Sequence, residues 1–221
     1  MRLIIPIFLA IVFGIIYVNA EYRTYAGVNA GLGMMYVTTA FIGVLSSTSV
    51  LPIAAGERAP FYRERASQTY NAFWYFVVSS LVEIPYAVVM ALLYTAIFFP
   101  MVGFTGFGRF LIYWATIVLH IVMQTYSGQL VSFALPSIEV AQLAITLLDT
   151  FCFMFMGFNP PAMLLDAPPA VGDVPTRVYI EEVFGAKHAH MTQYVGIFLA
   201  IMAVFRIFTA LSMRFINHQK R

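Results

Sequence analysis

Three ionisable side chains lie inside apolar runs long enough to cross a bilayer, where they could carry a proton or form a buried ion pair. They are Glu83, Asp149 and Arg206. A charge at mid-bilayer costs at least ~2.5–3.5 kcal/mol unless it is paired or hydrated. At a rise of about 1.5 Å per residue, the three lie about 12 to 16 Å from the same membrane surface. We predict that Arg206 pairs with Glu83 or Asp149. Such a pair is either a fixed structural ion pair or a polar relay that moves between two conformations. The remaining alternative is a carboxylate that carries a proton.

The second candidate is a charged segment, residues 57–65, which holds five of the 22 charged residues (12 Lys+Arg and 10 Asp+Glu). No charge occurs between Arg23 and Glu57, or between Arg65 and Glu83. A segment this polar between long apolar runs is expected to lie in water. We predict that it receives force from a soluble partner.

Other chemical motifs are missing from the sequence. It contains no Gly-x-x-x-x-Gly-Lys-Ser/Thr loop to bind phosphates, no Gly-x-Ser-x-Gly elbow and no His-Glu-x-x-His pair. His188 and His190 lack a third metal ligand, and His120 is interpreted as a core histidine. We therefore predict neither a catalytic residue nor a metal site.

The composition is that of an integral membrane protein. The chain is 61% hydrophobic and 10% charged, with a mean hydropathy of +0.84. Soluble domains are about 45–50% apolar and about 25% charged. Because a spanning helix needs about 20 apolar residues, the 221 residues leave no room for a soluble catalytic domain.

The apolar runs predict an all-α fold with one domain over residues 1–221. Spans are expected at about 3–18, 27–50, 72–99, 110–133, 139–158 and 193–215. A loop over 51–70 follows the second span, and an external loop over 159–192 precedes the sixth. The positive-inside rule then places both termini and the charged segment in the cytoplasm. Pro85 predicts a kink in the third span.

The charged segment and the helix after it resemble a known family. The resemblance is carried by Glu57-Arg58, Phe61-Tyr62-Arg63-Glu64-Arg65-Ala66, Tyr70, Val82-Glu83-Ile84-Pro85-Tyr86 and Gly103-Phe104. Together they look like the G-subfamily ABC exporters, specifically the pleiotropic drug resistance transporters of plants, fungi and oomycetes. The ending, residues 179–185 and 215–221, looks most like the oomycete members. The similarity covers nearly the whole chain, as the second, C-terminal membrane domain.

The resemblance implies a six-helix ABC-2 type transmembrane domain. Such a domain works with a second membrane domain, in the same polypeptide or a partner chain, and with nucleotide-binding domains that hold ATP and Mg²⁺. No cofactor and no enzymatic activity are expected in this chain itself. In the family, a coupling helix after the second span rests on a nucleotide-binding domain. The matching residues are Glu57, Phe61, Tyr62, Arg63, Glu64 and Arg65.

The resemblance also implies a substrate cavity between the second and fifth spans. The matching residues are Phe41, Ile42, Leu45, Thr150 and Phe153, with Phe158 at the position of an apolar exit plug. The chain departs from the family at Leu165-Asp166-Ala167, which runs almost directly into the late part of the external region. We expect a deletion in the external loop, a fragment of a longer gene product or an imperfect gene model.

These features predict the membrane half of an ATP-driven exporter of lipophilic compounds or lipids. We expect it in the plasma membrane, in contact with lipid and not with nucleic acid. The alternatives are a proton-coupled secondary carrier that uses Glu83 and Asp149, and a truncated membrane scaffold that transports nothing.

Overall fold

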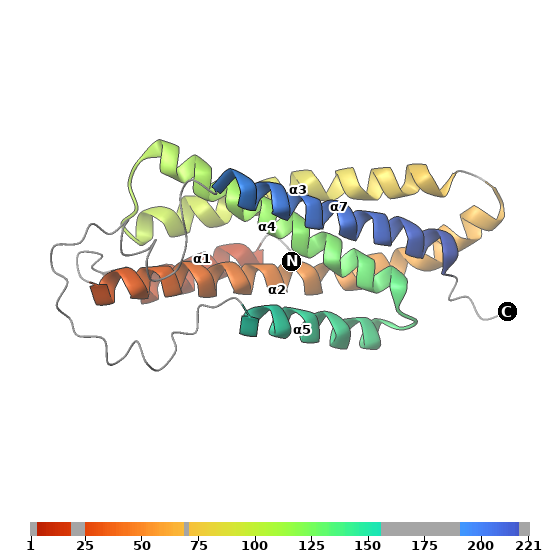
Figure 1. Ribbon diagram of the computed structural model, residues 1–221, viewed down its shortest axis with the longest axis horizontal. Coiled ribbons are helices and arrows are strands. Elements are labelled where there is room, and N and C mark those ends of the chain that lie inside the picture. The colour runs from red at the N-terminus through yellow and green to blue at the C-terminus, as the bar shows by residue number, and fades with distance from the viewer. Residues whose placement is uncertain (1–3, 19–24, 69–70, 156–190, 217–221) are drawn as a thin grey trace.

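The computed structural model describes residues 4–18, 25–68, 71–155 and 191–216, and every regular element in these ranges is an α-helix (Figure 1). The all-α prediction is therefore confirmed. The helices are α1 (Ile4–Ile16), α2 (Tyr25–Ala66), α3 (Ala72–Met101), α4 (Phe107–Ala134), α5 (Ile138–Phe155) and α7 (Met191–Phe215).

Four of these helices are long and apolar enough to cross a membrane. The qualifying segments are Asn29–Ala66, Phe73–Met101, Phe107–Ala134 and Thr192–Phe215. α1 is a shorter apolar helix of 13 residues, and α5 has 18 residues with Glu139 in its first turn. Both border residues outside the described ranges. The chain is an integral membrane protein whose long helices run along one axis (Figure 1).

The structure corrects the expected end of the second span. We expected a loop over residues 51–70, whereas α2 continues as a helix to Ala66 despite Pro52 and Pro60 inside it. Residues 51–66 are called the α2 extension below. Its buried side chains recur at helical spacing, at Ala54, Arg58 and Phe61. This amphipathic face packs on the bundle and compensates the backbone hydrogen bonds that the two prolines remove.

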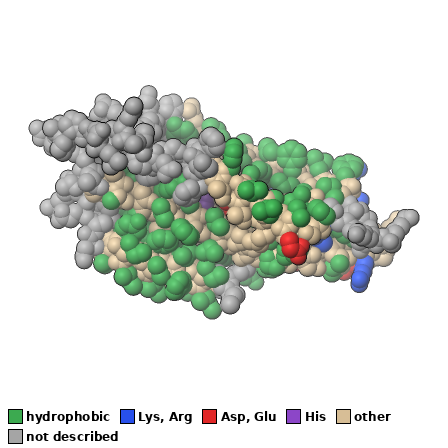
Figure 2. Space-filling view, turned by 90° about the horizontal axis from the view of Figure 1, so that it is seen from below, with side chains coloured by type: hydrophobic (Ala, Val, Ile, Leu, Met, Phe, Trp, Pro, Cys, Tyr) green, Lys and Arg blue, Asp and Glu red, His purple; other side chains and the backbone are tan. Residues whose placement is uncertain are grey.

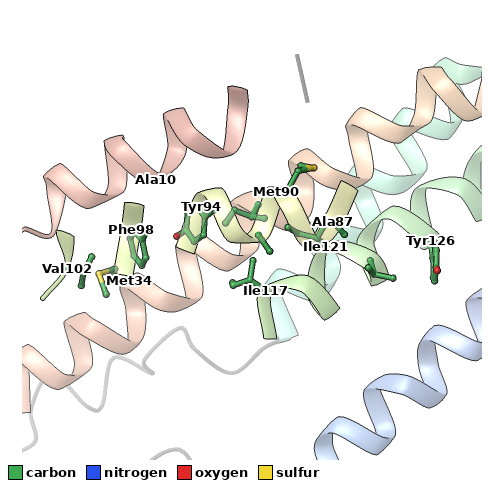
Figure 3. Packing of buried hydrophobic residues seen from close by; sticks show 13 residues of the cluster. Ala10, Met34, Ala87, Met90, Tyr94, Phe98, Val102, Ile117, Ile121 and Tyr126 are labelled. Atoms are coloured by element: carbon green, nitrogen blue, oxygen red, sulfur yellow. The ribbon is translucent and has the colours of Figure 1, made fainter. Parts of the chain in front are cut away.

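α4 lies at the centre of the bundle and contacts α2, α3, α5 and α7. Figure 3 shows the main core cluster, in which side chains of α1, α2, α3 and α4 meet. Tyr94 and Phe98 of α3 stack with ring centroids 5.1 Å apart, and both side chains are fully buried. The predicted core position of His120 agrees with its place against Gly43 of α2.

Gly128 sets the distance between α2 and α4. A Cβ at this position would lie 2.6 Å from the Ser47 carbonyl oxygen and 2.5 Å from Val50 Cγ1. The first of these atoms is backbone and cannot rotate away. The two helices therefore approach closely because residue 128 has no side chain, as small residues commonly allow in membranes.

We expect Gly128→Ala to lower the free energy of unfolding by about 1–3 kcal/mol, because the added methyl group overpacks the α2–α4 contact. The measurement is thermal unfolding of the purified chain in detergent, followed by tryptophan fluorescence. The matched control is Gly196→Ala on α7, where a Cβ would meet nothing within 4 Å. Equal stability of the two variants would contradict the close approach at Gly128.

Candidate functional site

The inner face of the α2 extension binds the C-terminal end of α7. Arg65 donates from Nη1 to the Met213 carbonyl at 2.7 Å and from Nη2 to the Arg214 carbonyl at 2.9 Å. The Tyr62 hydroxyl donates to the Ile216 carbonyl at 3.0 Å. Segments nearly 150 residues apart in sequence are thus joined at one end of the bundle, where Figure 1 shows both helices ending.

These bonds supply donors to the carbonyl groups at the C-terminal end of α7. The last four carbonyls of a helix have no partner within the helix, and the helix dipole places partial negative charge there. A guanidinium is a favourable partner because its charge is permanent and its donors form a planar fork. We call the Arg65 and Tyr62 bonds the α7 clamp.

Aromatic packing holds α3 and α4 at the same end of the bundle. Phe61 is fully buried, and its ring centroid lies 4.6 Å from that of Tyr75 on α3 and 6.1 Å from that of Phe133 on α4. The Tyr75 hydroxyl donates to Glu57 Oε2 at 2.8 Å. The Arg58 Nη2 group donates to the Pro136 carbonyl at 3.4 Å, between α4 and α5. The α2 extension therefore contacts the start of α3, the end of α4, the turn before α5 and the end of α7.

The predicted coupling residues divide between two faces. Phe61 and Tyr62 are buried in the bundle, and Arg65 is bound to α7. Arg63 and Glu64 are exposed on the outer face. Figure 2 shows basic side chains gathered toward this end, while hydrophobic side chains cover much of the remaining described surface. Arg63 and Glu64 therefore face outward, whereas the aromatic pair packs inside the protein.

Arg206 of α7 lies among neutral polar groups and aromatic rings. Its Nη1 donates to Gln129 Oε1 at 2.6 Å, and its Nη2 donates to the Phe76 carbonyl at 3.2 Å and to Ser80 Oγ. The guanidinium carbon lies 4.4 Å from the Phe76 ring centroid and 4.3 Å from that of Tyr126. Arg206 thus joins α7 to α3 and α4.

The two predicted acidic partners lie in different surroundings. Glu83 on α3 lines the same small pocket as Gln129, to which Arg206 donates a hydrogen bond. Asp149 on α5 instead accepts a 3.0 Å hydrogen bond from Ser47 Oγ on α2. The direct hydrogen bonds of Arg206 go to neutral groups, so a relay through Glu83 or Asp149 stays a prediction.

The predicted cavity residues on α2 and α5 lie in different environments. Ile42 is buried and Leu45 half-buried, and both line a small pocket with Pro6 of α1 and Met90 of α3. Phe41 is 51% exposed, and its ring centroid lies 5.6 Å from that of Phe13 on α1.

On α5, Thr150 is exposed, and its hydroxyl donates to the Thr146 carbonyl of the same helix. The Phe153 side chain, Phe158 and the pair His188 and His190 lie outside the described residues. Within the described part of the chain, no cluster of His, Cys, Asp and Glu could hold a metal.

Sequence reasoning missed several residues of these sites. Gln129, Ser80 and Ser47 are neutral polar residues within apolar helices, where only ionisable residues were considered. The sequence also gives no sign that the Tyr75 hydroxyl on α3 donates to Glu57 on α2. A search for hydrogen-bonding side chains facing the predicted intramembrane charges would have found the first three.

The fold and these contacts define a helical membrane domain with a helix extension tied across one end of its bundle. The family model of the ABC-2 type transporter matches residues 1–168. Because this is most of the chain, the chain belongs to the ABC-2 type transporter family and is a transporter membrane domain.

Its curated relatives are ABC transporters of the G family. ABC transporter G family member 36 of Oryza sativa subsp. indica is 29% identical over 218 residues, covering 86% of this chain and 15% of that protein. Pleiotropic drug resistance protein 1 of Nicotiana tabacum is 26% identical over 250 residues, covering 100% of this chain and 17% of that protein. The resemblance to the G-subfamily ABC transporters and to the pleiotropic drug resistance proteins is therefore confirmed. The chain spans 15% to 17% of these relatives' length.

We expect Arg65→Gln to accelerate amide exchange in the last turn of α7 by about tenfold or more, which corresponds to ~1.5 kcal/mol for a lost hydrogen bond to a charged group. The reason is that the Met213 and Arg214 carbonyls lose their charged donor. Hydrogen–deuterium exchange of the peptide containing residues 208–216 measures this. Arg63→Gln, which removes an exposed arginine of the same segment, is the control. If both variants exchange alike, the α7 clamp does not hold the helix end.

Proposed function

We propose that this chain is the transmembrane half of an ATP-driven exporter of lipophilic compounds or lipids. ATP and Mg²⁺ bind a nucleotide-binding domain outside these residues, which docks on the outer face of the α2 extension. Both termini lie in the cytoplasm, and the membrane is the plasma membrane. The proposal is supported by the family, by the G-family relatives and by the geometry of the extension.

The observation that carries the proposal is that the α2 extension has one exposed face and one face packed on the bundle. Its outer face exposes Arg63 and Glu64 to a soluble partner, and its inner face binds α3, α4 and α7 through buried groups. A push on the outer face therefore moves several helix ends together. Pro52 removes one backbone hydrogen bond where the extension begins, which makes that point easier to bend.

We further propose that the substrate lies against α2 and α5 at the surface shared with a second membrane domain. Phe41 on α2 and Leu143, Leu147 and Phe151 on α5 are exposed apolar side chains. Thr150 adds an exposed hydroxyl beside them. Pockets for lipophilic ligands are mainly apolar with a few polar groups. Ile42 and Leu45, by contrast, would support this surface from the α1 side.

We expect Glu64→Arg to lower ATP-driven export by about tenfold, because reversed charge on the outer face repels the docked partner, within the usual 5–150-fold range of coupling. Transport into proteoliposomes by the assembled transporter is measured, together with ATPase activity. Membrane insertion is unaffected because Glu64 is exposed. Ala66→Arg, an exposed position in the same turn, is the matched control.

Normal export by Glu64→Arg would contradict the coupling role of the outer face. Transport that continues without ATP and follows a pH gradient would favour the proton-coupled carrier. Partner binding without any transport would favour the scaffold.

A further inference from the structure

A cavity of about 790 Å³ opens between α3 and α7 at the end of the bundle where the α7 clamp lies. Its size is in the range of pockets that hold small molecules. Figure 1 shows that the start of α3 and the end of α7 lie at this same end. The cavity is separate from the α2–α5 surface and from the outer face of the α2 extension, so neither proposed role accounts for it.

The lining combines an apolar body with basic groups. Apolar side chains of α3 and α7 form the body: Phe73, Phe76, Ala203, Ile207, Ala210, Leu211 and Met213. Asn71 and three arginines, Arg65, Arg206 and Arg214, supply the polar atoms, and no lining residue is acidic. A ligand that matches this lining has a hydrophobic part and a negatively charged part.

The arginines retain donors for such a ligand. A guanidinium carries five N–H donors, of which Arg65 uses one on each terminal nitrogen for α7. Arg206 Nε is buried and has no hydrogen-bond partner among the described residues. Arg214 is exposed, and its guanidinium carbon lies 5.5 Å from the Phe215 ring centroid without a hydrogen bond to any described side chain.

Two of the three arginines lie at the rim of the cavity, whereas Arg206 lies deeper, next to Ile207 in the sequence of α7. Arg65 and Arg214 belong to the last turns of α2 and α7, and Asn71 caps the start of α3. Ile207 and Ala210 are one to two turns deeper, about 6 to 10 Å from Arg214 at 1.5 Å per residue. A phosphate at the rim therefore places an acyl chain along the apolar body.

We propose that this cavity binds an anionic phospholipid, with its phosphate held by Arg214 and Arg65 and one acyl chain lying along Ile207 and Ala210. Basic pockets between membrane helices on the cytoplasmic side bind anionic headgroups, and arginine binds phosphate bidentately. The bound phosphate adjoins the α7 clamp. The lipid composition of the leaflet therefore affects how the α2 extension holds the end of α7. Placement in the cytoplasmic leaflet rests on the proposed orientation; binding itself does not.

The test is native mass spectrometry of the full chain in detergent, titrated with phosphatidylserine or with phosphatidylcholine of the same acyl chains. We expect the wild-type chain to bind phosphatidylserine more tightly. Arg214→Gln should weaken phosphatidylserine binding about fivefold, which corresponds to ~1 kcal/mol per basic residue. Arg109→Gln removes an exposed arginine at the opposite end of the bundle and should leave the preference unchanged.

A second variant tests the apolar part of the cavity. Ala210→Trp places a large side chain in the acyl path and should weaken binding of both lipids, while Gly196→Ala on the same helix should not. Equal binding of the two lipids to the wild type, or an equal loss in Arg214→Gln and Arg109→Gln, would overturn the proposal. Preferential binding of a neutral lipophile would make the cavity a substrate pocket and would also overturn it. No ATP or transport enters these measurements, so their failure leaves the export proposal standing.

Discussion

The rest of the structure depends on one constraint, which is that the last carbonyl groups of α7 need hydrogen-bond donors from outside the helix. A helix that ends at a membrane surface must satisfy its last carbonyls with water or with donors from elsewhere in the protein. Here Arg65 and Tyr62 supply those donors from the α2 extension. Because the same extension buries Phe61 between α3 and α4, one helical segment fixes several helix ends relative to one another. This arrangement joins the end of α2 to helices that are long and apolar enough to cross a membrane.

Arg206 forms a second polar centre, which also attaches α7 to neighbouring helices but lies deeper in the bundle. Its guanidinium binds Gln129 on α4 and Ser80 on α3, with the rings of Phe76 and Tyr126 on its faces. Hydrogen bonds and cation–π contacts offset the cost of a charge in an apolar environment. α7 is consequently attached to the bundle at two levels, near its end and near its middle. Motion transmitted to the end of α7 would therefore carry most of the helix.

Much of the fold could be predicted from the sequence, because apolar runs of spanning length leave few alternatives. The start of α3 was predicted at residue 72, and Asn71 caps it. The end of α2 was not predicted, since Pro52 and Pro60 and the dense charge are typical of a loop. In the structure this segment is helical, and Ala54, Arg58 and Phe61 are buried on one face of it. The partners of Asp149 and Arg206 were missed because each is a neutral residue distant in sequence, and single-sequence periodicity carries no information on such pairs.

The most direct test measures the distance between the α2 extension and the end of α7. Spin labels at Ala66 and Phe215, both exposed, would report it by double electron–electron resonance after replacement of the single cysteine, Cys152. The tie through Arg65 and Tyr62 predicts one narrow distance distribution in lipid nanodiscs, unchanged when ATP is added to the assembled transporter. A broad distribution, or separation of the two labels on addition of ATP, would contradict the claim that these helix ends move as one body.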